Sequence, residues 1–394
     1  MSVVVAGVGM IPFAKPGRSE TYDRMGAEAV RRALADAGVS LADIRQAYAG
    51  YVYADSAAGQ TAIYGVGETG IPIVNVNNYC ASGSTALWLA RQAVESGAVD
   101  CALAVGFEQM APGAIGTVFP DRPDSLHRFA AARQRRGAHP DVPPAALYFG
   151  EAGAEYAAAY DMDPAVFALV AVKSRRHAAA NPYAVFRDPL TVDEVLASPH
   201  IHGPLTRLQC CPPTCGAAAA VLCTPAFAAA HGIDASVRIR AQAMTSDRPD
   251  SFEGDARALV GATIARRAAD AVYADAGVDP LDIPVAEVHD CFTTNEVLAY
   301  EALRLTPDGT AEQFIRDGDN TYGGRVVVNP SGGLLSKGHP LGATGLAQCA
   351  ELVWQLRGAA GARQVDGARL ALQHNIGLGS ACVVTLYERL DAAS

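Results

Sequence analysis

The sequence predicts an α/β protein built from two similar halves. Apolar, strand-like runs alternate with alanine-rich segments that have helical spacing, an order typical of layered sheets and helices. The strand-like runs are apolar throughout, so we expect strands that are buried on both faces and mostly parallel. Of the 394 residues, 50% are hydrophobic and 18% are charged, which is enough apolar surface for a large core and excludes bulk disorder.

The elements follow one another in a regular order in each half. Helices are expected where alanine-rich stretches end at a glycine, because glycine accepts the left-handed conformation that closes a helix. In the first half we expect a strand at 2–9, a helix at 27–38, a strand at 71–79, a helix at 84–97 and a strand at 101–109. In the second half we expect a strand at 284–288, a helix at 294–303, and strands at 368–377 and 381–387.

The middle of the chain breaks this alternation. From about residue 111 to residue 213 it is rich in proline and arginine, and its clearest helix candidate spans 164–182. Long connections of this kind commonly carry function or cover a binding site. We therefore expect an excursion that covers a site, after which a strand at 217–222 resumes the first half.

An internal duplication supports the prediction of two halves. Ala35–Val39 recurs as Ala274–Val278, and Cys80–Leu87 aligns with His339–Leu346 with Gly, Thr and Leu in register. Several matches in the same order indicate a repeated unit rather than chance. The predicted units are a first half at 1–118 plus 215–234, a loop domain at 119–214 that covers the site, and a second half at 235–394.

The duplication places Cys80 and His339 at equivalent positions, each before the first turn of a helix. Unpaired N–H groups at a helix N-terminus favour a thiolate. Most cysteines are simply small buried hydrophobes, but the small residues at 81–83 and the matching histidine favour a nucleophile with its base. The glycine-rich segment 331–345 permits close approach of the backbone to a ligand, and it lacks the GxxxxGK[ST] pattern of a phosphate loop.

Two further blocks supply candidate site residues. His289 and Cys291 stand two apart at the end of the strand at 284–288, so we expect their side chains on one side. The simpler alternative is that Asp290 caps the next helix beside an incidental cysteine. Backbone N–H groups of the block at 374–379, which contains Gly377, could complete an anion nest, although a plain turn between two strands explains the glycines equally well.

Composition excludes several classes of protein. The 31 basic and 41 acidic side chains give a net charge of −10, which disfavours nucleic-acid binding through a general basic surface. No apolar run reaches the roughly 18–20 residues that cross a bilayer, so we expect no membrane span. Nine cysteines without the spacing of a disulfide scaffold favour reduced thiols and a cytoplasmic location.

A metal site is not expected. The candidate zinc ligands have irregular spacing interrupted by prolines, whereas structural zinc sites favour paired knuckles. Arginine pairs in the middle segment are expected on solvated faces, and one of them could instead neutralise a phosphate group of a ligand. The zinc candidates are His200, His202, Cys210, Cys211 and Cys215, and the arginine pairs are Arg135-Arg136 and Arg175-Arg176.

Taken together, these blocks resemble the thiolase superfamily, and most closely its sterol carrier protein X type. The resemblance covers essentially the whole chain and implies a five-layered αβαβα fold made from two related halves with an inserted loop domain. It also implies acyl-CoA and coenzyme A as partners, no tightly bound cofactor, and a homodimer or a higher homo-oligomer. The matching segments are GYVYADSAAGQ, NVNNYCASGS, QCCPPTCGAAAA, HDCFTTNE, NPSGGLLSKGHPLGATGLAQCAEL and ALQHNIGLG.

The resemblance also implies a role for individual residues. Asn375 stands where standard-type thiolases carry a second cysteine, and in this subfamily the acid/base thiol comes from the HDCF block instead. One departure is Cys215, where the family often has Asp near the coenzyme A arm. By position, Cys80 matches the nucleophile, His339 its base, His289 an oxyanion-hole group, Cys291 the acid/base thiol, and Gly377 a backbone donor to the thioester oxygen.

The expected reaction is therefore thiolysis of a 3-oxoacyl-CoA, as in fatty-acid β-oxidation, or the reverse Claisen condensation, through an acyl group on Cys80. One alternative is a retro-aldolase of the lipid-transfer-protein branch that works with a small OB-fold partner. Members of that branch lack the thiolase set of groups, so the presence of Cys80, Cys291 and His339 disfavours it. A second alternative, a non-catalytic lipid-binding protein, would not need reactive thiols at helix termini.

Overall fold

A computed structural model describes residues 2–112, 116, 120–134 and 142–391. Its ten main strands form one mixed sheet in the order β10-β9-β11-β12-β8-β1-β7-β4-β2-β3. The strands are β1 Val3–Met10, β2 Gln46–Gly50, β3 Ile73–Val76, β4 Cys101–Glu108, β7 Gly216–Cys223, β8 Val237–Thr245, β9 Val285–Glu287, β10 Val327–Val328, β11 Leu370–Gly377 and β12 Ala381–Arg389.

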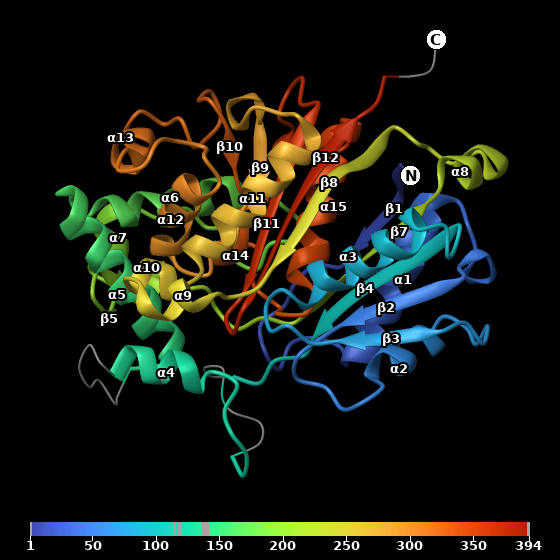
Figure 1. The fold of residues 1–394 in the computed structure, drawn as a ribbon, viewed down its shortest axis with the longest axis horizontal. Helices are drawn as coiled ribbons and strands as arrows, with labels where there is room; N and C mark the ends of the chain where they lie inside the picture. Colours follow the sequence, from blue (N-terminus) through green and yellow to red (C-terminus); the bar gives the residue numbers. More distant parts are fainter. Residues whose placement is uncertain (1, 113–115, 117–119, 135–141, 392–394) are drawn as a thin grey trace.

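The strand order confirms the two similar halves. The series β3-β2-β4-β7-β1 is mirrored by β10-β9-β11-β12-β8, so each strand has a counterpart in the other half. The halves join through a short antiparallel contact in which Val3 pairs with Ile239 and Val4 with Arg238. Figure 1 shows the blue strands of the first half and the red and orange strands of the second half running at an angle to each other.

Helices complete the five layers that the resemblance implies. Helix α1 (Tyr22–Ala37) packs on β1 and β7, and α11 (Ala262–Ala276) packs on β8 and β12, so these helices cover the two outer faces. Helices α3 (Ser82–Glu95) and α15 (Thr344–Arg357) pack against each other and against strands of both halves, so they form the central layer.

The repeated Ala-Asp-Ala-Gly motif ends the two outer helices. Gly38 caps α1 with φ 68° and Gly277 caps α11 with φ 64°, both in the left-handed region. A side chain disfavours this conformation, which is why glycine closes both helices. The same local rule therefore operates at equivalent positions of the two halves.

The expectation of mostly parallel strands was wrong. Strand β2 is parallel to β3 and β4, and β9 is parallel to β10 and β11. The five strands β1, β7, β8, β11 and β12 meet in antiparallel pairs, as do β4 and β7. A continuous apolar run indicates that a strand is buried on both faces of its sheet. Here the central helices bury parallel and antiparallel strands alike, so the runs do not indicate strand direction.

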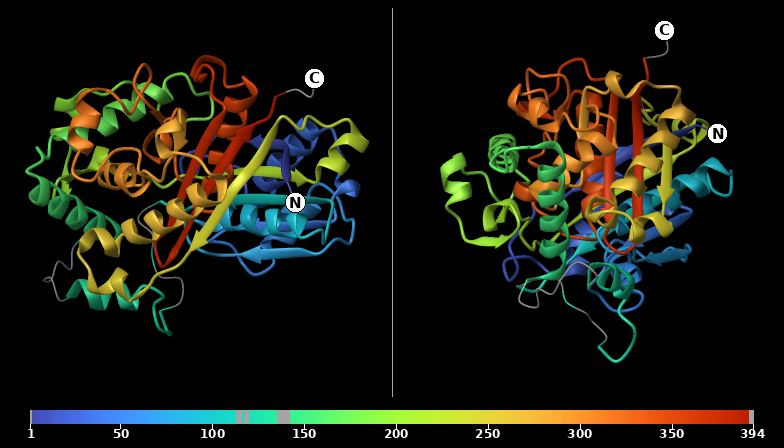
Figure 2. Two further views of the ribbon diagram at one scale, coloured as in Figure 1. Left: turned by 45° about the horizontal axis from the view of Figure 1, so that its top comes forward. Right: turned by 60° about the vertical axis from the view of Figure 1, so that its left-hand side comes forward.

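The segment between β4 and β7 leaves the first half and packs on the second. Helices α5 and α6 contact α12 (Thr293–Ala302), and α6 also contacts α14 (Gly333–Ser336). The green segment accordingly lies beside α12 and α10 (Ala256–Leu259), away from the strands it connects (Figures 1 and 2). Its elements are α4 His127–Gln134, α5 Pro144–Tyr160, α6 Val166–Ala178, α7 Val192–Leu196, β5 His200–His202 and β6 Leu205–Thr206.

A buried ion pair anchors this excursion. Lys173 on α6 contacts the carboxylate of Glu296 on α12, and both side chains are almost fully buried. Glu296 also accepts hydrogen bonds from Tyr300 and Asn329, and Lys173 donates to the carbonyl of Val328 at 3.2 Å. Buried charges are tolerated when they are paired and fully hydrogen-bonded, so α6 is held in one position over α12.

The remaining helices complete the second half and its connections. None of the helices in the described ranges is long and apolar enough to cross a membrane. The boundaries predicted for the three units stay predictions, and the one between 118 and 119 falls outside the described residues. These helices are α2 Ala58–Tyr64, α8 Pro225–His231, α9 Pro249–Glu253, α10 Ala256–Leu259 and α13 Ala311–Arg316.

Candidate active site

Cys80 lies on a tight turn between β3 and α3. Tyr79 adopts φ 47°, an uncommon left-handed conformation for a residue with a side chain. The hydroxyl of Ser82 holds the turn, because it donates to the carbonyl of Tyr79 at 2.6 Å and accepts from the amide of Asn78 at 2.9 Å. The turn leaves Cys80 7% exposed, immediately before the first turn of α3.

His339 lies on the equivalent loop before α15, and glycines bring the two loops together. A Cβ atom on Gly342 would lie 2.4 Å from the carbonyl oxygen of Phe107 and 2.5 Å from that of Gly50. A Cβ atom on Gly83 would lie 2.4 Å from the carbonyl oxygen of Gly342. Gly342 and Gly83 therefore allow the backbones of the two halves to touch, and the expected approach of the glycine-rich block to a ligand stays a prediction.

Glu108 ties this contact together. Its carboxylate, at the end of β4, accepts hydrogen bonds from the amides of Val52, Tyr53 and Gly342 at 2.9–3.1 Å. Burial raises the pKa of Glu108 to about 7, although these three amides lower it. The group joins the loop that follows β2 to the loop that carries His339.

The structure brings the side chains of Cys80, His289 and His339 together. The Cys80 Sγ atom and one ring nitrogen of each histidine all lie within 4.8 Å of one another. The two rings meet edge to face, with 5.1 Å between their centres and an angle of 82°. His289 follows β9, so the three groups come from three separate loops and meet only in the folded chain.

Cys291 and Cys211 border this cluster. Cys291 is 5% exposed, and its carbonyl accepts the amide of Cys211 at 2.9 Å. Burial raises the pKa of Cys211, and the neighbouring thiols of Cys80 and Cys210 raise it further. The sequence presents Cys211 as a candidate zinc ligand; the fold brings it close to both Cys80 and Cys291.

The segment at 210–214 lies against the loops of the cluster. Pro213 bridges to His339, and Cys210 bridges to Phe292. The hydroxyl of Thr214 accepts the amide of His339 at 2.6 Å. The chain that returns from the inserted helices is thus fixed against two of the loops that form the cluster.

The electrostatics keep the resting groups neutral. Burial raises the pKa of Cys80 to about 12, helped by the negative charge of Glu108 and opposed by the backbone amides of Cys80 and Leu378. Burial lowers the pKa of His339 to about 3, and Lys337 lowers it further. Near pH 7 the site therefore holds a thiol and a neutral imidazole, and proton transfer between them must accompany attack by sulfur.

The hydrogen bonds of His339 fix which of its nitrogens can accept that proton. Its Nδ1 atom lies 2.7 Å from the hydroxyl of Thr344, and that hydroxyl donates its own proton to the carbonyl of Pro340 at 2.9 Å. Nδ1 must therefore carry the ring proton. Nε2 is buried and has no hydrogen-bond partner among the described residues, so it offers a lone pair inside the site.

Cys291 and Gly377 both lie near Cys80 or the turn that carries it. Burial raises the pKa of Cys291 well above the usual range, and Cys211 and Cys80 raise it further. A Cβ atom on Gly377 would lie 2.1 Å from the carbonyl oxygen of Asn78, so β11 ends against the Cys80 turn. The roles expected for these two residues stay predictions.

The candidate zinc ligands do not come together. His200 bonds the carbonyl of Gly203 at 2.9 Å, and the Cys215 Sγ atom accepts the amide of Met110 at 3.3 Å in a different part of the fold. Within the described ranges, the group close enough to hold a metal ion is the cluster itself. Cys215 is fully buried.

No phosphate-binding role follows for the arginine pairs. Arg176 donates to the hydroxyl of Thr321 at 2.8 Å, and Arg175 lies 4.6 Å from the ring centre of Phe186. Arg135 and Arg136 lie outside the described residues.

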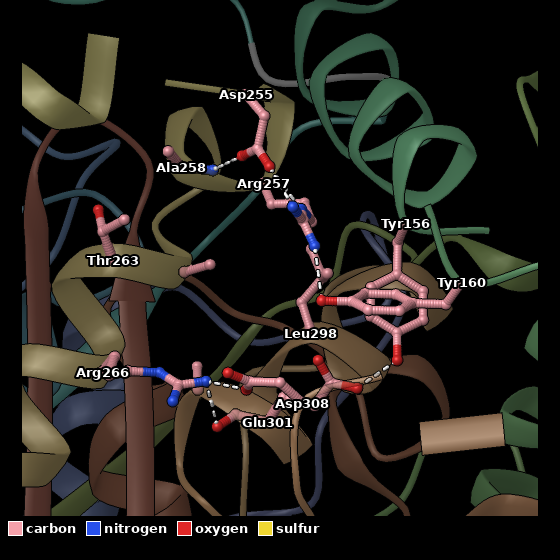
Figure 3. Close-up of a pocket in the computed structure, with 12 residues that line it drawn as sticks. Tyr156, Tyr160, Asp255, Arg257, Ala258, Thr263, Arg266, Leu298, Glu301 and Asp308 are labelled. Carbon is pink, nitrogen blue, oxygen red and sulfur yellow. Dashed lines mark hydrogen bonds and ion pairs between the residues drawn. The ribbon is translucent and has the colours of Figure 1, made fainter. Parts of the chain in front are cut away.

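A separate cavity of about 360 Å³ lies where α5, α10, α11 and α12 meet. Its charged groups pair with one another: Arg257 with Asp255, and Arg266 with Asp308 (Figure 3). The cavity lies at the C-terminal end of α12, whereas the thiols and imidazoles lie at its N-terminal end. It therefore takes no part in the cluster.

The fold and the site together point to one class of protein, the thiolases. The chain has two duplicated halves, with a cysteine and a histidine on their equivalent loops. The chain matches the family models of the thiolase N-terminal domain over residues 3–225 and of the thiolase C-terminal domain-like unit over residues 252–389. The chain therefore belongs to the thiolase family, which confirms the resemblance and the expected fold.

Three individual proteins show what this chain is similar to within the family and its fold. Sterol carrier protein 2 of chicken (Gallus gallus) is 50% identical over 389 residues, which cover 98% of this chain and 71% of the relative. An acetyl-CoA acetyltransferase of Methanothermobacter thermautotrophicus is 37% identical over 394 residues, 98% of this chain and 99% of the relative. A solved structure described as an Ltp2-ChsH2(DUF35) aldolase has the same fold, with a TM-score of 0.82, 24% identity and 98% of each chain covered.

Proposed function

We propose that this thiolase-family chain cleaves 3-oxoacyl-CoA with coenzyme A, or runs the reverse Claisen condensation, through an acyl group carried on Cys80. The observation that carries the proposal is the meeting of one thiol and two imidazoles within 4.8 Å, with a second thiol at the border. The acetyl-CoA acetyltransferase among the relatives supports the choice of acyl transfer.

In the first half-reaction, His339 accepts a proton from Cys80. The Cys80 sulfur attacks the 3-oxo carbon while its proton passes to Nε2 of His339, the buried nitrogen with a free lone pair. The alkoxide then collapses to a thioester on Cys80 and expels the neighbouring carbon as the enolate of a shorter acyl-CoA. Oxyanion donors stabilise the charged oxygens, each by about 3 kcal/mol.

The second thiol accounts for the remaining protons. Cys291 protonates the enolate carbon and becomes a thiolate, and it then takes the proton of the incoming coenzyme A. The coenzyme A sulfur attacks the acyl group, and Cys80 leaves as a thiolate that recovers its proton from His339. The enzyme returns to its starting state, and no redox partner is consumed.

The partners, the location, the oligomeric state and the metabolic role are likewise proposals. Coenzyme A and acyl-CoA as partners follow from the proposed reaction, with no tightly bound cofactor. The cytoplasmic location, the homodimer, and a role in β-oxidation stay predictions. A metal ion held by Cys80 and the two histidines would block the sulfur, so added chelator should leave activity unchanged.

A retro-aldolase is the second candidate, because the aldolase structure shares the fold. Such an enzyme cleaves a 3-hydroxyacyl-CoA and consumes no free coenzyme A. It would work here with a partner subunit of OB fold, and it would not need the thiol pair of Cys80 and Cys291.

One assay separates the two candidates. The purified protein is mixed with 3-oxoacyl-CoA substrates of straight, 2-methyl and steroid-side-chain type, with and without coenzyme A. The matching 3-hydroxyacyl-CoA substrates are tested in parallel, with the protein alone and with an added OB-fold partner subunit. We expect release of acetyl- or propionyl-CoA only when free coenzyme A is present. Cleavage of 3-hydroxyacyl-CoA without coenzyme A, together with no thiolysis of any substrate in the panel, would replace the thiolase proposal with the aldolase.

A further inference from the structure

A chain of hydrogen bonds with a single direction leads to the ring of His289. The side-chain amide of Gln373 donates to the carbonyl of Gly345 at 2.7 Å and to the hydroxyl of Ser84 at 3.0 Å. Ser84 lies 2.8 Å from Oδ1 of Asn375, and Nδ2 of Asn375 lies 3.0 Å from Nδ1 of His289.

The carbonyl of Gly345 sets the direction of the whole chain. A carbonyl only accepts hydrogen bonds, so the Gln373 atom that faces it is the NH₂ group. Ser84 therefore accepts from Gln373 and has its single proton left for Asn375. The Asn375 atom that faces Ser84 is then the oxygen, and the atom that faces His289 is the NH₂ group.

His289 must accept at Nδ1, so its ring proton is on Nε2. Its side chain is buried, and Gln373, Ser84 and Asn375 have no exposed surface, so water does not replace a partner in the chain. Ser84 belongs to α3 of the first half, whereas Gln373 and Asn375 belong to β11 of the second. The proton position of His289 thus depends on the contact between the halves.

The two histidines therefore present opposite polarity to the Cys80 thiol. His339 offers a lone pair, because Thr344 holds its proton at Nδ1. His289 offers an N–H group, because Asn375 occupies its Nδ1. A site that activates a thiol and stabilises a charged oxygen needs one group of each kind.

We propose that Asn375 is a positioning residue that fixes His289 with its proton on Nε2, where the N–H group serves as an oxyanion donor in the cleavage of 3-oxoacyl-CoA. This inference rests on the proposed function for the use of the N–H group, but the position of the proton does not depend on any substrate. Ser84 and Gln373 act through Asn375 and set its orientation.

Nitrogen NMR of protein with ¹⁵N-labelled histidine measures the proton position directly. The signals of His289 are assigned by their loss in His289→Gln. We expect a protonated Nε2 and a bare Nδ1 in the unaltered protein. A proton on Nδ1 would overturn the proposal, whatever the activity.

Asn375→Asp reverses the polarity with almost no change in shape. A carboxylate offers only acceptors, so Nδ1 of His289 must supply the proton, and in a neutral ring Nε2 then loses it. We expect the NMR signal of Nδ1 to become that of a protonated nitrogen and thiolysis to fall by about 10²–10³-fold, the usual effect of removing one oxyanion donor. An unchanged Nδ1 signal in the folded variant would contradict the proposal.

Two further variants provide a control and a second test of the hydrogen-bond chain. Asn78→Asp makes the same amide-to-acid change beside Cys80, but its amide bonds Thr85 at 3.1 Å, so His289 should keep its proton on Nε2. Ser84→Ala removes the relay without adding charge and should give His289 both proton positions. A single, unchanged position in Ser84→Ala would overturn the role of the chain, even if Asn375→Asp does not fold.

The NMR and activity readouts separate two kinds of failure. A protein with the expected proton positions that thiolyses no 3-oxoacyl-CoA would contradict the proposed function and leave the hydrogen-bond chain standing. A protein that thiolyses well but carries the His289 proton on Nδ1 would support the proposed function and contradict the role of the hydrogen-bond chain.

Discussion

Replacing His339 with alanine is expected to slow acyl-enzyme formation by about 10²–10⁴-fold while the fold persists. Burial raises the pKa of the Cys80 thiol to about 12, so almost none of it is thiolate near pH 7. Attack then depends on transfer of its proton to Nε2 of His339, which is buried and otherwise unpartnered in the described chain. Rapid quenching after mixing with acyl-CoA, followed by intact-protein mass spectrometry, gives the rate.

A matched control is His231→Ala, which removes an exposed histidine at the end of α8. This variant should acylate at the full rate. Circular dichroism checks that His339→Ala remains folded. A folded His339→Ala protein with the full acylation rate would show that the glycine-rich block is structural only.

The Cys291→Ala variant is expected to accept an acyl group on Cys80 and yet lose carbon–carbon cleavage. Transfer from acyl-CoA requires the nucleophile and the oxyanion donors, whereas cleavage also requires a proton for the departing carbon. Exchange of the α-protons of acetyl-CoA in deuterated buffer should therefore fall together with cleavage, by at least about 10²-fold. The two activities are measured by acyl labelling and by mass spectrometry of the exchanged acetyl-CoA.

Cys382→Ala is the matched control, because Cys382 is fully buried in β12 and packs in the core. It should keep both activities. Normal exchange in Cys291→Ala would place the proton donor elsewhere, and Cys211 and His374 would be the groups to replace next.

The elements of the fold were predictable where the signal is local. Gly38 and Gly277 end helices because a glycine accepts the left-handed conformation there, and the surrounding repeat is visible in the sequence. Strand direction was not predictable. Burial on both faces makes β1 and β7 apolar throughout whether their neighbours run parallel or antiparallel.

In the candidate site, too, the sequence indicates the residues in local motifs but not their partners that are remote in sequence. Cys80, His289, Cys291 and His339 each lie in a short motif at the end of a strand or the start of a helix, so the sequence indicates them one by one. The hydrogen-bond partners that set their chemistry are remote in sequence. Ser84 and Asn375, for example, are separated by 291 positions and meet only when the two halves pack.

Cys211 illustrates the same limit. In the sequence it is one of an adjacent pair in a proline-rich stretch, with no spacing that assigns it a partner. The fold places its amide on the carbonyl of Cys291 at 2.9 Å, because the returning chain crosses the loops of the second half. A contact of this kind depends on the path of the whole inserted segment.

The most direct measurement is the location of the acyl group. The protein is incubated with acyl-CoA and quenched in acid, and its peptides are mapped by mass spectrometry. We expect the acyl group on the peptide that contains Cys80, and its loss from that peptide when free coenzyme A is added before the quench. An acyl group on another cysteine, with Cys80 unmodified, would contradict the assignment of the nucleophile and the reaction built on it.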